Sequence, residues 1–156
     1  MLWLGMLVAS VLAVGGCIDD VDRDSYVERN EAIRKSLPAF PGATMIRVEH
    51  SPNRSGPDGG GRIVSYGTIV DYRVHAGTRP RKVAGFYERR LKGWRIARSK
   101  QTSTSSSRWF VRGNATVALS LDDLLPNVRD NPRGKGGRIF TVVIDHDYYG
   151  TRDEFR

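Results

Sequence analysis

Two aspartates flank a histidine near the end of the chain, at Asp145, His146 and Asp147. Carboxylate and imidazole groups bind divalent metals and transfer protons during hydrolysis. If a β-strand runs through this segment, successive side chains point to opposite faces, so His146 lies opposite the two aspartates. We therefore expect His146 to be a hydrogen-bonded residue at the core or edge, continuing the face of Phe140, Val142 and Ile144.

Other catalytic patterns are missing from the sequence. Serines are frequent, with a cluster at 103–107, but none stands in a Gly-x-Ser-x-Gly elbow. Adjacent carboxylates at Asp19-Asp20 and Asp122-Asp123 fall outside the expected helices and strands, where nothing fixes their separation. Three histidines and one cysteine leave little material for a metal site. We expect no catalytic residues, no metal and no cofactor. A cell-envelope hydrolase or metal-dependent enzyme using Asp145, His146 and Asp147 stays open as the alternative.

Positive charge is concentrated in one part of the chain. The sequence has 25 Lys and Arg against 17 Asp and Glu, a net charge of +8. Segment 79–112 is rich in bases and has Glu88 as its single acid. This pattern is typical of a solvated helix face, and equally of a surface that attracts anions. The candidate anion-binding residues are Arg81, Lys82, Arg89, Arg90, Lys92 and Arg95.

The first residues of the chain are apolar and uncharged up to the single cysteine, Cys17. The run ends in small residues, Val14-Gly15-Gly16, as a signal-peptide cleavage site does. These residues resemble the lipobox of bacterial lipoproteins. The resemblance implies cleavage before Cys17, acyl chains such as palmitate on its thiol and new amino group, and an extracytoplasmic location at the cell membrane or outer membrane. A plain transmembrane anchor, or a free thiol in a tail, are the alternatives.

An exported, basic domain has a restricted set of partners. The membrane would be reached through the lipid on Cys17, and anionic lipids or acidic envelope polymers through the bases. Trp94, Trp109 and Phe110 lie near the basic segment, as in surfaces that stack nucleobases. We do not expect nucleic-acid binding, because aromatics that alternate within strands belong to cores. The sequence leaves any protein partner unknown.

Periodicity predicts the elements of the first half. Ser25 and Glu28 match a capping box, which predicts a helix over about 26–36. A bend at Pro38–Gly42 leads into a strand over 44–49, and the Gly- and Pro-rich segment 51–62 is expected to be a loop. Alternating apolar residues predict a strand over 63–75.

In the second half, a helix over 79–92 is expected, capped by Thr78, with Pro80 in its first turn and Gly93 after its end. Strands should follow around Trp94–Arg98, on both sides of a Gly113-Asn114 hairpin turn, and over 139–146.

These elements predict a single two-layer α+β domain. Its sheet has five or six mainly antiparallel strands, one main helix packed on it and a short N-terminal helix, and a helical crossover permits one parallel pair. The expected organisation is a signal peptide (1–16), an acidic tether (17–24), the α+β domain (25–149) and a polar tail (150–156).

Two motifs strengthen the lipoprotein reading. Leu37-Pro38-Ala39-Phe40-Pro41-Gly42-Ala43 precedes the first strand, and Val83-x-x-Phe86-Tyr87-x-x-x-Leu91-x-Gly93-Trp94 spans the main helix. Together they resemble small, mostly uncharacterised bacterial lipoproteins. The resemblance implies a fold and an envelope location, and it supplies no activity. The sequence thus predicts a membrane-anchored, non-enzymatic binding module with a basic face.

Overall fold

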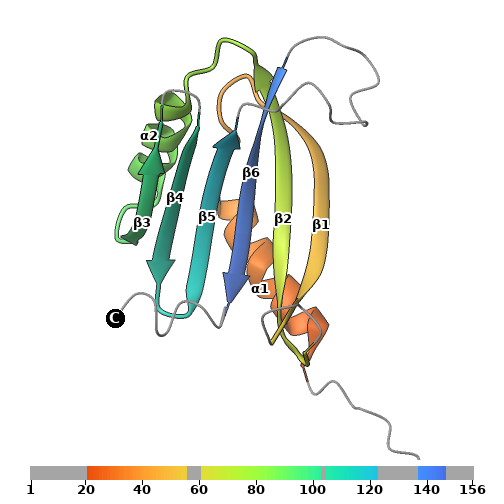
Figure 1. Ribbon diagram of the computed structural model, residues 1–156. Helices are drawn as coiled ribbons and strands as arrows, with labels where there is room; N and C mark the ends of the chain where they lie inside the picture. Colours follow the sequence, from red (N-terminus) through yellow and green to blue (C-terminus); the bar gives the residue numbers. More distant parts are fainter. Residues whose placement is uncertain (1–20, 56–60, 103–104, 123–136, 147–156) are drawn as a thin grey trace, which may run out of the picture.

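Six strands form one sheet, and two helices lie on one of its faces (Figure 1). The computed structural model describes residues 21–55, 61–102, 105–122 and 137–146. The helices are α1 (Arg23–Ser36) and α2 (Pro80–Arg90). The strands are β1 (Thr44–Arg54), β2 (Ile63–His75), β3 (Arg95–Gln101), β4 (Ser106–Arg112), β5 (Ala115–Asp122) and β6 (Gly137–His146).

The sheet is open and antiparallel throughout. Its strand order is β1-β2-β6-β5-β4-β3, so β1 and β3 form the two edges. The predicted α+β architecture is confirmed. The parallel pair that the sequence permitted does not form, because the chain after α2 continues at the far edge of the sheet, away from β2. The last strand, β6, then returns to the middle and joins the β1–β2 hairpin to the other three strands.

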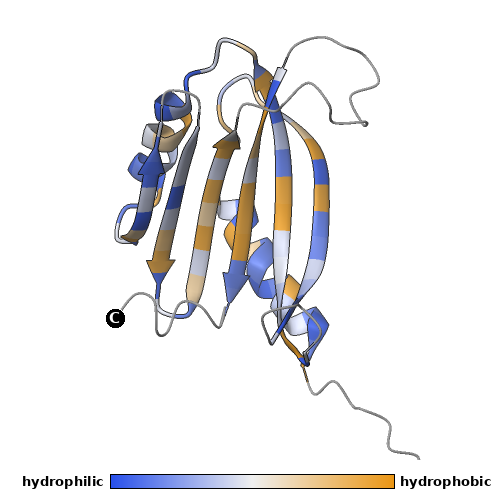
Figure 2. Ribbon diagram, viewed as in Figure 1, coloured by the Kyte–Doolittle hydropathy of each residue, from blue (hydrophilic) through white to orange (hydrophobic). Residues whose placement is uncertain are grey.

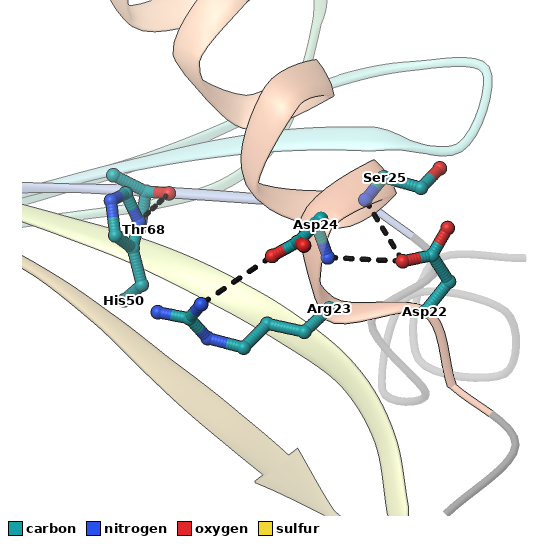
Figure 3. A network of polar contacts seen from close by, with 6 residues as sticks. All are labelled: Asp22, Arg23, Asp24, Ser25, His50 and Thr68. Atoms are coloured by element: carbon teal, nitrogen blue, oxygen red, sulfur yellow. Dashed lines mark hydrogen bonds and ion pairs between the residues drawn. The ribbon is translucent and has the colours of Figure 1, made fainter.

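Helix α1 begins three residues before the predicted position. The side chain of Asp22 caps it by accepting hydrogen bonds from the backbone N–H groups of Asp24 (3.1 Å) and Ser25 (3.3 Å), as Figure 3 shows. The expected capping box of Ser25 and Glu28 is therefore wrong, since Asp22 already satisfies the free N–H groups at the helix start. With 14 residues, α1 is also longer than α2, which has 11.

Helix α2 differs from its prediction at both ends. Pro80 occupies the first helical position, as expected, but the capping residue is Arg79 rather than Thr78. In the described part of the chain, the N-terminus of α2 has no side-chain capping hydrogen bond. The helix ends at Arg90, and Gly93 follows with φ of +84°. That left-handed conformation suits glycine, so Gly93 turns the chain into β3.

Alternating side chains build the core on the helix side of the sheet. Figure 2 shows apolar and polar residues alternating along the central strands. Tyr72 of β2 stacks on Phe140 of β6 with ring centroids 4.8 Å apart, and Phe86 of α2 meets Phe40 edge-on at 5.4 Å. Further buried members are Val70, Val74, Val83, Tyr87, Leu91, Phe110, Val117, Leu119, Leu121, Val142 and Ile144.

Two hairpins set the register of the strands that they join. Gly113, with φ of +58°, forms the two-residue turn between β4 and β5, as the sequence predicts. The first hairpin is longer than predicted, because β1 continues to Arg54 through residues expected to form a loop. Asn53 pairs with Ser65 across this hairpin, and a 2.8 Å hydrogen bond joins their side chains.

Among the described residues, no helix has both the length and the apolarity needed to cross a bilayer.

Candidate anion-binding surface

Asp145 and His146, the centre of the candidate catalytic segment, point to opposite faces of β6. The carboxylate of Asp145 lies on the face away from the helices, where it accepts hydrogen bonds from Asn53 Nδ2 and from Ser65 Oγ (3.2 Å). His146 Nδ1 lies 2.9 Å from Oδ1 of Asn30 in α1, on the helix side. The expected hydrogen-bonded histidine is confirmed. The third residue of the segment, Asp147, lies outside the described residues.

The polar group around Asp145 is a structural cluster that the sequence did not reveal. Ser65 is fully buried and Asp145 is 4% exposed. Thr116 lies opposite Asp145 across the β5–β6 pair, and its buried hydroxyl has no hydrogen-bond partner among the described residues. Gly67 lies in β2 beside this cluster, and a methyl group there would come within 3.7 Å of the Asp145 carboxylate. One signal of this cluster is visible in the sequence, the polar Ser65 in the alternating pattern of β2. Its hydrogen-bonding partners could not be predicted, because they come from β1 and β6.

No metal-binding group was found in the described parts of the chain. Within them, no three His, Cys, Asp or Glu side chains converge in a way that would hold an ion. The two described members of the candidate catalytic segment are separated by the sheet itself, so they share no site with each other.

The basic residues of α2 lie on its outer side. Arg81, Lys82 and Arg89 are exposed, while Val83, Phe86 and Tyr87 face the sheet. Figure 2 shows the corresponding hydrophilic colouring of α2 and of β3 beside it. Within the described chain, none of the ion pairs includes any of these three bases.

The other three candidate residues, Arg90, Lys92 and Arg95, differ in their surroundings. Arg90 stacks its guanidinium over the ring of Phe86, 3.8 Å from the centroid. Lys92 is exposed in the turn after α2, and Arg95 is exposed where β3 begins. Arg95 pairs with Val111, which lies on the face away from the helices, so the six predicted residues do not all share one flat face.

Strand β3 adds bases that continue this positive surface around the sheet edge. Arg98 and Lys100 are exposed there and pair with Trp109 and Ser107 of β4. One base of this region is neutralised: Arg108 Nε donates to the Glu88 carboxylate at 2.9 Å and joins β4 to α2. Because Glu88 is the single acid of segment 79–112, the segment has a strongly positive net charge.

A groove lies where α2 begins. It has a volume of about 360 Å³ and is lined by Arg79, Pro80, Arg81, Gln101 and Thr102. The first turn of α2 carries no acidic residue. The N-terminus of a helix carries a partial positive charge, which disfavours the nearby arginines. An anion bound here would be stabilised by both the helix dipole and the arginines. We call the exposed bases of α2, the following turn and β3 the basic surface; its members are Arg81, Lys82, Arg89, Arg90, Lys92, Arg95, Arg98 and Lys100.

No protein-family model matches the chain, and no curated protein matches it at a significant level.

Proposed function

We propose that this chain is a membrane-anchored extracytoplasmic lipoprotein whose domain binds anionic envelope components through the basic surface. The lipid is placed on Cys17, because the only cysteine of the chain follows an uncharged apolar run and small residues. Two or more acyl chains anchor a protein stably, at about 0.8 kcal/mol per buried methylene.

The exposure of Arg81, Lys82 and Arg89 on α2 carries the binding part of this proposal. These residues form none of the ion pairs described and have no acid near them in the sequence other than Glu88, which pairs with Arg108. A cation near an anionic lipid surface contributes about 1 kcal/mol. Several such bases on one side therefore supply useful affinity without a shaped pocket.

The test compares two sets of charge reversals in the full chain, purified in mild detergent. One variant combines Arg81→Glu, Lys82→Glu and Arg89→Glu. Its control combines Lys35→Glu, Arg54→Glu and Arg62→Glu, which are also exposed and change the net charge equally. Binding to polyphosphate, polyglutamate and single-stranded DNA is measured across a salt series.

We expect the α2 variant to lose about two orders of magnitude in affinity for all three polymers, while the control loses far less. Binding should weaken steeply with salt. Equal losses in both variants would count against a localised surface, and a strong preference for single-stranded DNA would favour the nucleic-acid alternative.

The anchor is tested separately. Mass spectrometry of the mature N-terminus should find acyl chains on Cys17, and Cys17→Ser should release the protein from the membrane fraction. A Cys17→Ser chain that stays in the membrane would contradict the lipid anchor and leave the polymer test unaffected.

A further inference from the structure

The two edges of the sheet differ in chemistry. At one edge, β3 exposes the bases Arg95, Arg98 and Lys100, so the same edge of a second copy would be repelled. At the other edge, β1 exposes apolar side chains: Met45 is 50% exposed, Ile46 40% and Val48 39%. Edge strands offer unpaired N–H and C=O groups to another chain, and exposed apolar residues favour that pairing.

The charges beside Val48 are self-complementary. Arg47 and Glu49 flank it on the other face of β1, with side chains 57% and 49% exposed. Within one chain they form an ion pair at 3.2 Å, and Arg47 also contacts the Asp71 carboxylate at 2.7 Å. If two β1 strands pair antiparallel about a two-fold axis at Val48, Arg47 of each copy lies opposite Glu49 of the other. Opposite charges in directly facing positions stabilise a strand pair. A two-fold axis at His50 instead places Glu49 opposite Ser51, so the charges select one register.

The backbone of β1 is oriented for this pairing. Val48, His50 and Pro52 are alternate residues that pair in regular register with Val70, Thr68 and Tyr66 of β2. A proline within a sheet lies on an edge strand with its nitrogen toward the open side, because it has no N–H to donate. Residues two and four positions earlier share this orientation, so the N–H and C=O groups of His50 and Val48 point away from β2.

We propose that two copies of this chain pair through β1, antiparallel and two-fold symmetric about Val48, to extend their sheets into one. Isologous pairing of this kind closes on itself and leaves no free β1 edge. The bulge between Met45 and Arg47 shortens the regular part of the strand. The pairing segment is therefore short, and we expect the dimer to dissociate on dilution.

Covalent trapping tests this register directly. Val48→Cys and, as the matched control, Ile96→Cys are each introduced into the Cys17→Ser full chain, so that each variant has one thiol. Ile96 lies on the other edge strand and is 49% exposed, slightly more than Val48. Directly opposite residues of an antiparallel pair have Cα atoms about 5.5 Å apart, within the range that a disulfide spans.

Under mild oxidation in detergent, we expect Val48→Cys to form a disulfide-linked dimer at least about tenfold faster than Ile96→Cys, because only position 48 meets itself. Adding Glu49→Arg places like charges opposite each other at both ends of the pair. This change should slow trapping about tenfold, whereas Glu28→Arg on the exposed side of α1 should not. The proposal would be overturned if the disulfide-linked dimer formed at the same rate at positions 48 and 96. It would also be overturned if Glu49→Arg did not change the rate at position 48.

Discussion

Asn30 and His146, which are 116 positions apart, are joined by a 2.9 Å hydrogen bond between Oδ1 and Nδ1. Asn30 Nδ2 donates to the backbone carbonyl of Tyr66 at 2.7 Å. Because that carbonyl only accepts, the amide orientation is determined, and Nδ1 of His146 carries the proton. One fully buried asparagine thus holds α1 against both β2 and β6.

We predict that Asn30→Ala destabilises the domain by about 2–4 kcal/mol, since it leaves the Tyr66 carbonyl and the His146 ring without this partner. Urea unfolding of the full chain in detergent measures the loss. His146→Ala and the double variant complete a thermodynamic cycle, in which the two single losses should not add. Strict additivity would show that the two side chains do not cooperate.

The Asp22 cap gives a second prediction. Asp22→Ala should cost about 1 kcal/mol, because two N–H groups at the start of α1 lose their acceptor. Asp22→Ser should retain most of the stability, since serine also caps helices. Asp24→Ala serves as the control, because Asp24 is the exposed second residue of the helix and does not cap it. If Asp22→Ala and Asp24→Ala have the same effect, capping is not the cause.

Tyr87 should make the stability of the folded domain sensitive to alkali. Burial raises the pKa of its phenol, which is 1% exposed, above the ordinary value of about 10. Because the folded pKa is the higher one, the folded state retains this proton more tightly than the unfolded state. The resulting stability is present below pH 10 and is lost as the pH rises above it.

Tyr87→Phe should therefore lose less stability than the parent chain between pH 10 and pH 12, as measured by urea unfolding at several pH values. Tyr72 retains part of the effect, because burial raises its pKa too. Parallel stability curves for the two chains would contradict this assignment.

Glu31 should make the stability of the folded domain depend slightly on pH in the acid range. The hydrogen bond from Arg34 lowers the pKa of the Glu31 carboxyl below 4.5, and the two side chains are 2.7 Å apart. A lowered folded pKa means that the stability is present above pH 4.5 and is lost as the pH falls through the folded value.

Glu31→Gln should cost up to about 1 kcal/mol at pH 7. The difference from the parent chain should vanish in acid, where both residues are neutral. Glu28→Gln on the exposed side of α1 is the control for the loss of charge alone. A difference that persists at pH 2 would indicate packing rather than the ion pair.

Several elements follow from local sequence alone. Alternation along 63–75 predicts β2, Pro80 marks the first turn of α2, and Gly113 marks the turn between β4 and β5. Each depends on side chains or backbone angles within a few residues, which is why the sequence suffices. The prediction that His146 and Asp145 point apart has the same basis, the two-residue repeat of a strand.

The contacts between these elements depend on the tertiary structure. The extension of β1 to Arg54 depends on pairing with β2. The cluster of Asn53, Ser65 and Asp145 joins three strands. Such contacts depend on strand order and register, which arise only when distant segments bury their apolar faces together.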